Sequence, residues 1–183
     1  MLNYRNLTAI LQGLRPPLSD VVAASRLAPC LVEIWLNDYS RVASEYDVVE
    51  TKNEGFSYLF DISAERLIAA WGVSKGKDAS PRAIIATRMK GHPLTNIIGG
   101  KRYHRGHAVP HTMGGRTDIN LVPQLGLINS GPFQELERLA VVTPGSLYFT
   151  YWSYPDSRTQ RPSGVEQGCL IAGSIPKIVN FRN

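Results

Sequence analysis

Three histidines, His104, His107 and His111, fall within eight residues of this chain, and Arg105 lies among them. A neutral imidazole can accept a proton from water, and a guanidinium can hold a phosphate through paired hydrogen bonds. The segment therefore contains the residue types that hydrolysis of a phosphate ester requires, with a divalent metal ion held by ligands elsewhere.

Two other interpretations of the histidine cluster stay open at this point. Histidines in an HxxHxxxH spacing could ligate zinc, which takes four ligands, or three ligands and a water. Gly106 and Pro110 lie between them and argue against one continuous helix, so the three rings need not share a face. The histidines could also be surface or core residues that share no task.

The residues after the cluster extend it into a longer pattern. Asn120-Leu121-Val122-Pro123-Gln124 follows His104-Arg105-Gly106-His107, Asn129 comes five residues after Gln124, and Glu137 comes eight residues after Asn129. This pattern resembles that of the DNA/RNA non-specific endonucleases, a branch of the ββα-metal (His-Me finger) nuclease superfamily. That family carries Asp-Arg-Gly-His, then Asn-x-x-Pro-Gln, and then a helix-borne Asn and a Glu at the same spacings.

The resemblance covers residues 100–140 and contains departures. His104 stands where the family has an aspartate, so the task of that carboxylate is lost or moved. The family usually has a further arginine upstream, for which Arg82 and Arg88 are the candidates. The segment 110–118 is also similar to a subset of these nucleases that are toxin modules of bacterial competition systems.

The resemblance implies a role for each residue of the pattern. His107 would be the general base that takes a proton from the attacking water, and Arg105 would brace the scissile phosphate. Asn129 would bind Mg²⁺ or Mn²⁺ through its side-chain oxygen, and Glu137 would hold the metal or a water bound to it. Asn120 would fix the loop beside the metal-binding helix or contact the phosphate.

Helix geometry is compatible with a shared site for the last two residues of the pattern. Eight residues along a helix correspond to a rotation of about 80°, so Asn129 and Glu137 can face one cavity two turns apart. The alternatives are that Asn129 caps the helix and that Glu137 is an ordinary solvated carboxylate. His104 and His111 are expected to orient loops or to touch phosphate.

Apolar spacing and turn residues predict the elements that must position these side chains. In the first half we expect mainly helices, one strand, and an exposed loop or linker at residues 74–81. The expected helices are residues 2–14, 19–29, 31–46 and 64–71, and the expected strand is 55–60. In the second half we expect strands at 83–88, 103–109, 147–154 and 165–172 and a helix at 133–140.

These elements predict an α+β protein with a ββα-metal nuclease core and extra strands. We expect two parts: a helical N-terminal region, residues 1–80, packed on the core, and a nuclease domain, residues 81–183. The chain length of 183 residues suits one substantial core. Cys30 and Cys169 are far apart in sequence and are expected to be free thiols.

The overall charge favours a polyanionic partner. The formal net charge is +5 and the pI is about 9.4, and cationic side chains bind phosphate backbones with release of counterions. No apolar run approaches the roughly 20 residues that cross a membrane, so no membrane association is expected. The polar N-terminus does not resemble a signal peptide.

Together these features predict a metal-dependent endonuclease that hydrolyses DNA, with RNA as a second candidate substrate and little base preference. By analogy with the toxin modules, we expect an antibacterial effector toxin that a cognate immunity protein neutralises. It would act in the bacterial cytoplasm or be delivered into a target cell by a dedicated secretion system. The rival hypotheses are a non-catalytic nucleic-acid-binding module and a zinc-stabilised structural domain.

Overall fold

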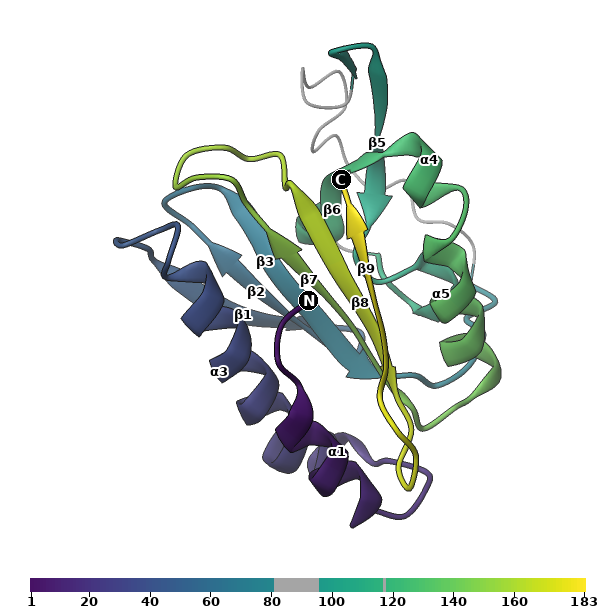
Figure 1. The fold of residues 1–183 in the computed structure, drawn as a ribbon. Helices are drawn as coiled ribbons and strands as arrows, with labels where there is room; N and C mark the ends of the chain where they lie inside the picture. The colour runs from purple at the N-terminus through teal and green to yellow at the C-terminus, as the bar shows by residue number, and fades with distance from the viewer. Residues whose placement is uncertain (81–95, 117) are drawn as a thin grey trace.

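The structure is a computed structural model, and it describes residues 1–80, 96–116 and 118–183. Two antiparallel sheets carry the fold, with helices on both sides of the larger one (Figure 1). The elements in chain order are α1 (Arg5–Gln12), α2 (Asp20–Val22), the π-helical turn η1 (Ala23–Leu27), α3 (Ala28–Tyr39), β1 (Val48–Asn53), β2 (Phe56–Asp61), β3 (Arg66–Val73), β4 (Ile97–Ile98), β5 (Lys101–His107), the 3₁₀ turns η3 (His111–Met113) and η4 (Asp118–Asn120), β6 (Leu121–Leu125), α4 (Gly126–Asn129), α5 (Phe133–Val142), β7 (Leu147–Ser153), β8 (Gly164–Leu170) and β9 (Lys177–Arg182).

The larger sheet has six strands in the order β1-β2-β3-β7-β8-β9. Helices α1 and α3 lie on one side of it, and α4 and α5 lie on the other (Figure 1). Strands β3 and β8 are buried along their whole length because the sheet is covered on both faces. β3 is apolar after its first residue, Arg66, whereas β8 carries the buried polar residues Glu166 and Gln167.

Aromatic side chains fill the space between α3 and the larger sheet. Trp35 of α3 is fully buried, and its ring lies 5.5 Å from that of Trp71, 5.3 Å from that of Phe149 and 6.1 Å from that of Tyr151. Its indole nitrogen donates a 3.1 Å hydrogen bond to the hydroxyl of Tyr4. Aromatic rings bury large apolar areas, so this cluster fixes α3 on the sheet.

The predicted α+β class is confirmed, but the prediction for residues 1–80 is wrong in two respects. Three strands occupy residues 48–73, and β3 replaces the helix predicted at 64–71. Moreover β3 pairs with β7, with Ala69 opposite Tyr151, so one sheet contains strands from both sides of the predicted boundary at residue 80. Residues 1–80 are therefore not mainly helical, and their strands share one sheet with strands of the predicted nuclease part.

The smaller sheet has three strands in the order β4-β5-β6, and the helices α4 and α5 follow it in the chain. Strand β5 pairs antiparallel with β6, with His107 opposite Leu121. This order of two paired strands and a helix agrees with the predicted ββα unit. The predicted strand 83–88, Arg82 and Arg88 lie outside the described residues.

The segment predicted as a linker is tied to the core at two points. Ser74 is buried, its backbone N–H donates to the carbonyl of Ser146, and its hydroxyl donates to the carbonyl of Ala140. Four residues later, the N–H of Asp78 donates a 2.7 Å hydrogen bond to the carbonyl of Thr112. These contacts connect the end of β3 with α5 and with the loop after β5.

Cys30 and Cys169 are both free thiols, as predicted. Within the described ranges, no helix has the length and apolar character that a membrane crossing would need.

The shared sheet predicts that the chain unfolds as one unit. Replacing Trp35 by Ala should lower the free energy of unfolding by about 3–5 kcal/mol, because it empties the space among three aromatic rings. Urea denaturation followed by far-UV circular dichroism and by tryptophan fluorescence should give one coincident transition. Val21→Ala, at a side chain that is 75% exposed, is the control and should change little. Two separate transitions would restore the two-domain division.

Candidate active site

A cavity of about 500 Å³ lies between the end of β5, the loop after it, and helices α4 and α5. His107, Asn129 and Glu137 all line it, and so does His111. The structure therefore brings together three residues that are up to 30 positions apart and that the sequence pattern assigned to one site.

Asn120 holds the chain that follows His107. Its side-chain oxygen accepts a 2.7 Å hydrogen bond from the N–H of Val109, and its side-chain nitrogen donates a 2.7 Å hydrogen bond to the carbonyl of Val109. The N–H of Ala108 also donates to the carbonyl of Asn120. The side chain of Asn120 is fully buried, and it fixes the loop after β5 rather than the loop beside the metal-binding helix that was predicted. Direct contact with a phosphate, and with it a catalytic role, does not fit.

The loop after β5 is further fixed by a glycine and an ion pair. A Cβ atom at Gly115 would lie 1.9 Å from the carbonyl oxygen of Val109, so only glycine permits this approach. The guanidinium of Arg116 is hydrogen bonded to the carboxylate of Asp78. His111 lies within this loop, so contacts before it at Val109 and after it at Gly115 and Arg116 hold its backbone in place.

Asn129 and Glu137 lie on two helices rather than on one. Asn129 is the last residue of α4, and α5 begins at Phe133 after a break that contains Pro132. The single continuous helix assumed in the 80° rotation is therefore not present, although both side chains still line the cavity. Asn129 does not cap α5, because Pro132 is in the N-cap position and makes no side-chain cap.

Glu137 is the carboxylate of the cavity, and its surroundings disfavour its charge. Burial raises the pKa of Glu137 to about 7, and the neighbouring Arg138 only partly opposes this. Removing a carboxylate from water penalises the ionised form unless a cation compensates. The position of Glu137 is therefore one at which a bound cation would stabilise the protein.

The oxygen donors of the cavity fit a hard divalent cation. Asn129 offers an amide oxygen and Glu137 a carboxylate, which are the ligand types that Mg²⁺ takes. The described part of the chain contains no group of three His, Cys, Asp or Glu side chains that could hold a metal. Mg²⁺ does not require one, because it keeps several waters and binds through one or two protein oxygens and substrate phosphates.

The zinc interpretation is not supported by the positions of the three histidines. His107 and His111 line the cavity, whereas His104 is exposed and its ring lies against Gly126, at the start of α4. Since no cluster of three potential ligands forms among residues 1–80, 96–116 and 118–183, a three-histidine zinc site does not form.

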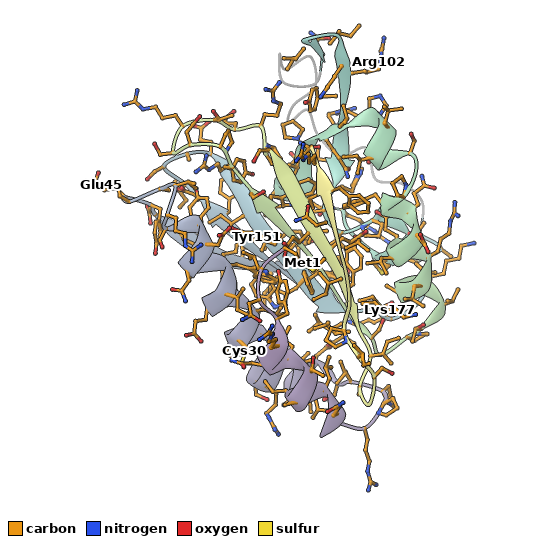
Figure 2. All side chains as sticks on the ribbon, viewed as in Figure 1. Met1, Cys30, Glu45, Arg102, Tyr151 and Lys177 are labelled. Carbon is orange, nitrogen blue, oxygen red and sulfur yellow. The ribbon has the colours of Figure 1, made fainter. Side chains whose placement is uncertain are left out.

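The basic side chains that line the cavity differ from the predicted one, Arg105. Arg105 is exposed on β5 and is not among the described residues of the cavity wall, where Lys77 and Arg138 lie instead. Arg102, near the start of β5, lies at the outer end of the β4–β5 hairpin (Figure 2). The sequence carries a signal for Arg138, which adjoins Glu137, but none for Lys77, which reaches the site through tertiary packing alone.

Comparisons with known proteins support the fold. No protein-family model and no curated protein matches the chain. Among solved structures, NucA from Streptococcus agalactiae with no metal bound matches with a TM-score of 0.51 and 13% identity, covering 90% of this chain and 92% of NucA. NucA with a magnesium ion bound matches with a TM-score of 0.52 and 14% identity, covering 81% of this chain and 89% of NucA. The chain thus shares the fold of a nuclease, over far more than residues 100–140.

The raised pKa of Glu137 predicts a pH-dependent effect of its removal in metal-free protein. The folded state binds this proton more tightly than the unfolded state, whose pKa is near the usual 4.5. The resulting stabilisation is complete below pH 4.5 and is lost as the pH rises through about 7. Glu137→Gln should therefore raise the free energy of unfolding at pH 8 by about 1–3 kcal/mol.

At pH 4.5 the same substitution should have almost no effect. Urea denaturation in EDTA at the two pH values measures the difference. Glu135→Gln, at an exposed position of the same helix, is the matched control and should be insensitive to pH. An equal effect of Glu137→Gln at both pH values would mean that the carboxylate is solvated.

Proposed function

We propose that the chain is a divalent-metal-dependent endonuclease that hydrolyses phosphodiester bonds in DNA, with RNA as a second candidate substrate. The observation that supports it most is the convergence of His107, Asn129 and Glu137 on one cavity. The shared fold with NucA, a nuclease that has been solved with a magnesium ion bound, supports the same activity. Mg²⁺, or Mn²⁺ in its place, is the proposed cofactor.

In the proposed reaction His107 is the general base. Its imidazole takes a proton from a water molecule as the oxygen of that water attacks phosphorus. His107 lies at the end of a paired strand, and Asn120 fixes the two residues that follow it. A base held in this way loses little entropy when the water and the phosphate bind.

Asn129 and Glu137 are the residues that would hold the metal ion. When bound, Mg²⁺ neutralises charge on the phosphate and on the leaving oxygen. Lys77 and Arg138 line the same cavity and can bind phosphate oxygens. Arg105, exposed two residues before His107, would bind the phosphate backbone beside the site. Contacts of this kind read no base, so little sequence preference is proposed.

Nuclease assays on plasmid DNA and on RNA test this proposal. Cleavage should occur with Mg²⁺ or Mn²⁺ and stop with EDTA, and His107→Ala should reduce it by about 10²–10⁴-fold. Asn129→Ala should raise the Mg²⁺ concentration that is needed.

His104→Ala is the matched control, because His104 lies on the same strand but is not among the residues that line the cavity. It should change the rate by about threefold or less, far below the loss expected of a general base. If His107→Ala keeps more than about a tenth of the activity, the assigned base is wrong. Binding of DNA without cleavage under all metal conditions would favour the non-catalytic module.

We further propose that the protein is an antibacterial effector toxin that a cognate immunity protein neutralises. The similarity of segment 110–118 to bacterial toxin modules supports this, as does the net charge of +5. Its site of action would be the cytoplasm of a bacterial target cell, reached by a dedicated secretion system.

Expression in the bacterial cytoplasm tests the toxin proposal. Induction of the wild-type chain should reduce colony formation and degrade chromosomal DNA, because no immunity protein is supplied. His107→Ala, expressed to the same level, should be tolerated. Normal growth of cells that accumulate active wild-type protein would contradict the proposal.

A further inference from the structure

The cavity contains a second imidazole that the proposed reaction has not yet used. His111 lines the cavity together with His107, and its Nε2 atom is buried without a hydrogen-bond partner among the described residues. Buried polar atoms are almost always hydrogen bonded, and exceptions at a site need a reason. A leaving oxygen that gains negative charge in the transition state would supply the missing partner.

The backbone that carries the His111 ring is held in place by hydrogen bonds around it. The carbonyl of His111 accepts a 3.0 Å hydrogen bond from the N–H of Gly114. The carbonyl of the next residue, Thr112, accepts from Asp78, and Asp78 is also paired with Arg116. Groups that act in a transition state must be positioned in advance in this way.

The chemistry of the cavity leaves one task without a residue. Hydrolysis requires a base for the water and a proton for the leaving oxygen, and His107 is assigned to the water. The other titratable or charged groups that line the cavity are Lys77, His111, Glu137 and Arg138. Glu137 is already assigned to the metal ion, and a lysine or arginine cation gives up its proton only at high pH. An imidazole exchanges protons near neutrality.

We propose that His111 is the general acid of the reaction and protonates the leaving oxygen through Nε2. The oxygen of water forms the new bond to phosphorus, and its proton passes to His107. As the bond from phosphorus to the leaving oxygen breaks, the electron pair stays on that oxygen, which takes the proton of the His111 imidazolium. Proton exchange of both rings with solvent then restores the starting state. This inference rests on the proposed function.

The test compares two leaving groups. On DNA the leaving alkoxide needs a proton, so His111→Gln should reduce kcat by about 10²-fold or more. On a thymidine p-nitrophenyl phosphodiester the leaving phenolate needs no proton, so the same variant should stay within about threefold of the wild type. His107→Ala should lose activity on both substrates. An equal loss for His111→Gln on both substrates, or no loss on DNA, overturns the proposal.

The pH dependence of kcat on DNA gives a second measurement that needs no artificial substrate. The wild type should show a bell-shaped profile, because one imidazole must be neutral and the other protonated. His111→Gln should lose the fall in rate on the alkaline side and keep the fall on the acid side. A variant profile that keeps both limbs overturns the assignment.

A binding measurement separates acid catalysis from ground-state contact with phosphate. In EDTA, the affinity of His111→Gln for a labelled DNA should equal that of the wild type within about twofold, because a general acid acts in the transition state. A loss of affinity as large as the loss of kcat would make His111 a phosphate-binding residue and overturn the proposal.

Thermal melting establishes that His111→Gln is folded, and Glu135→Gln, exposed on α5 and outside the cavity lining, serves as the control variant in every assay. If His107→Ala stays active or EDTA has no effect, the proposed function itself fails. If only the results with His111→Gln differ from those expected, the nuclease proposal stands and the assignment of the acid fails.

Discussion

The pair of hydrogen bonds between the carboxamide of Asn120 and the backbone of Val109 determines how the active-site loop is closed. These bonds join two points 11 residues apart, and Pro110, His111 and Thr112 between them line the cavity. The approach is so close that a side chain at Gly115 would collide with both partners. Because the bonds are buried, removing either partner would leave polar groups unsatisfied. The positions of His107 and His111 both depend on this closure.

The opposite wall of the cavity is positioned by the six-stranded sheet. The side chain of Gln167 on β8 donates a 2.8 Å hydrogen bond to the carbonyl of Phe133, at the first residue of α5. The hydroxyl of Ser74 donates to the carbonyl of Ala140 in the last turns of the same helix. Glu137 lies between these two anchors. The geometry of the site therefore depends on strands that are distant from it in the sequence.

One wall of the cavity is thus set by local contacts and the other by a distant sheet. This contrast explains which features the sequence could predict. His107, Asn129 and Glu137 belong to one local unit of paired strands and helices, so their spacing along the chain is already close to their arrangement in space. The helix is broken at Pro132, with α4 beside β5 and β6 and α5 beside β7 and β8, but Asn129 and Glu137 still line one cavity.

The sheet could not be predicted in the same way. Residues 66–73 form a short apolar run that suits a buried helix as well as a buried strand, and periodicity cannot separate the two. Only the strands that pair with this segment decide between helix and strand. Tyr151, which lies opposite Ala69, comes about eighty residues later in the chain. The pairing of β3 with β7 and the contribution of Lys77 were missed for the same reason.

The electrostatics of the cavity connect its loop wall with its helix wall. Burial raises the pKa of Glu137 to about 7, and this side chain must share the cavity with an anionic phosphate. Lys77 and Arg138 are single charges, so a divalent cation between carboxylate and phosphate would relieve both the desolvation of Glu137 and its repulsion of the substrate.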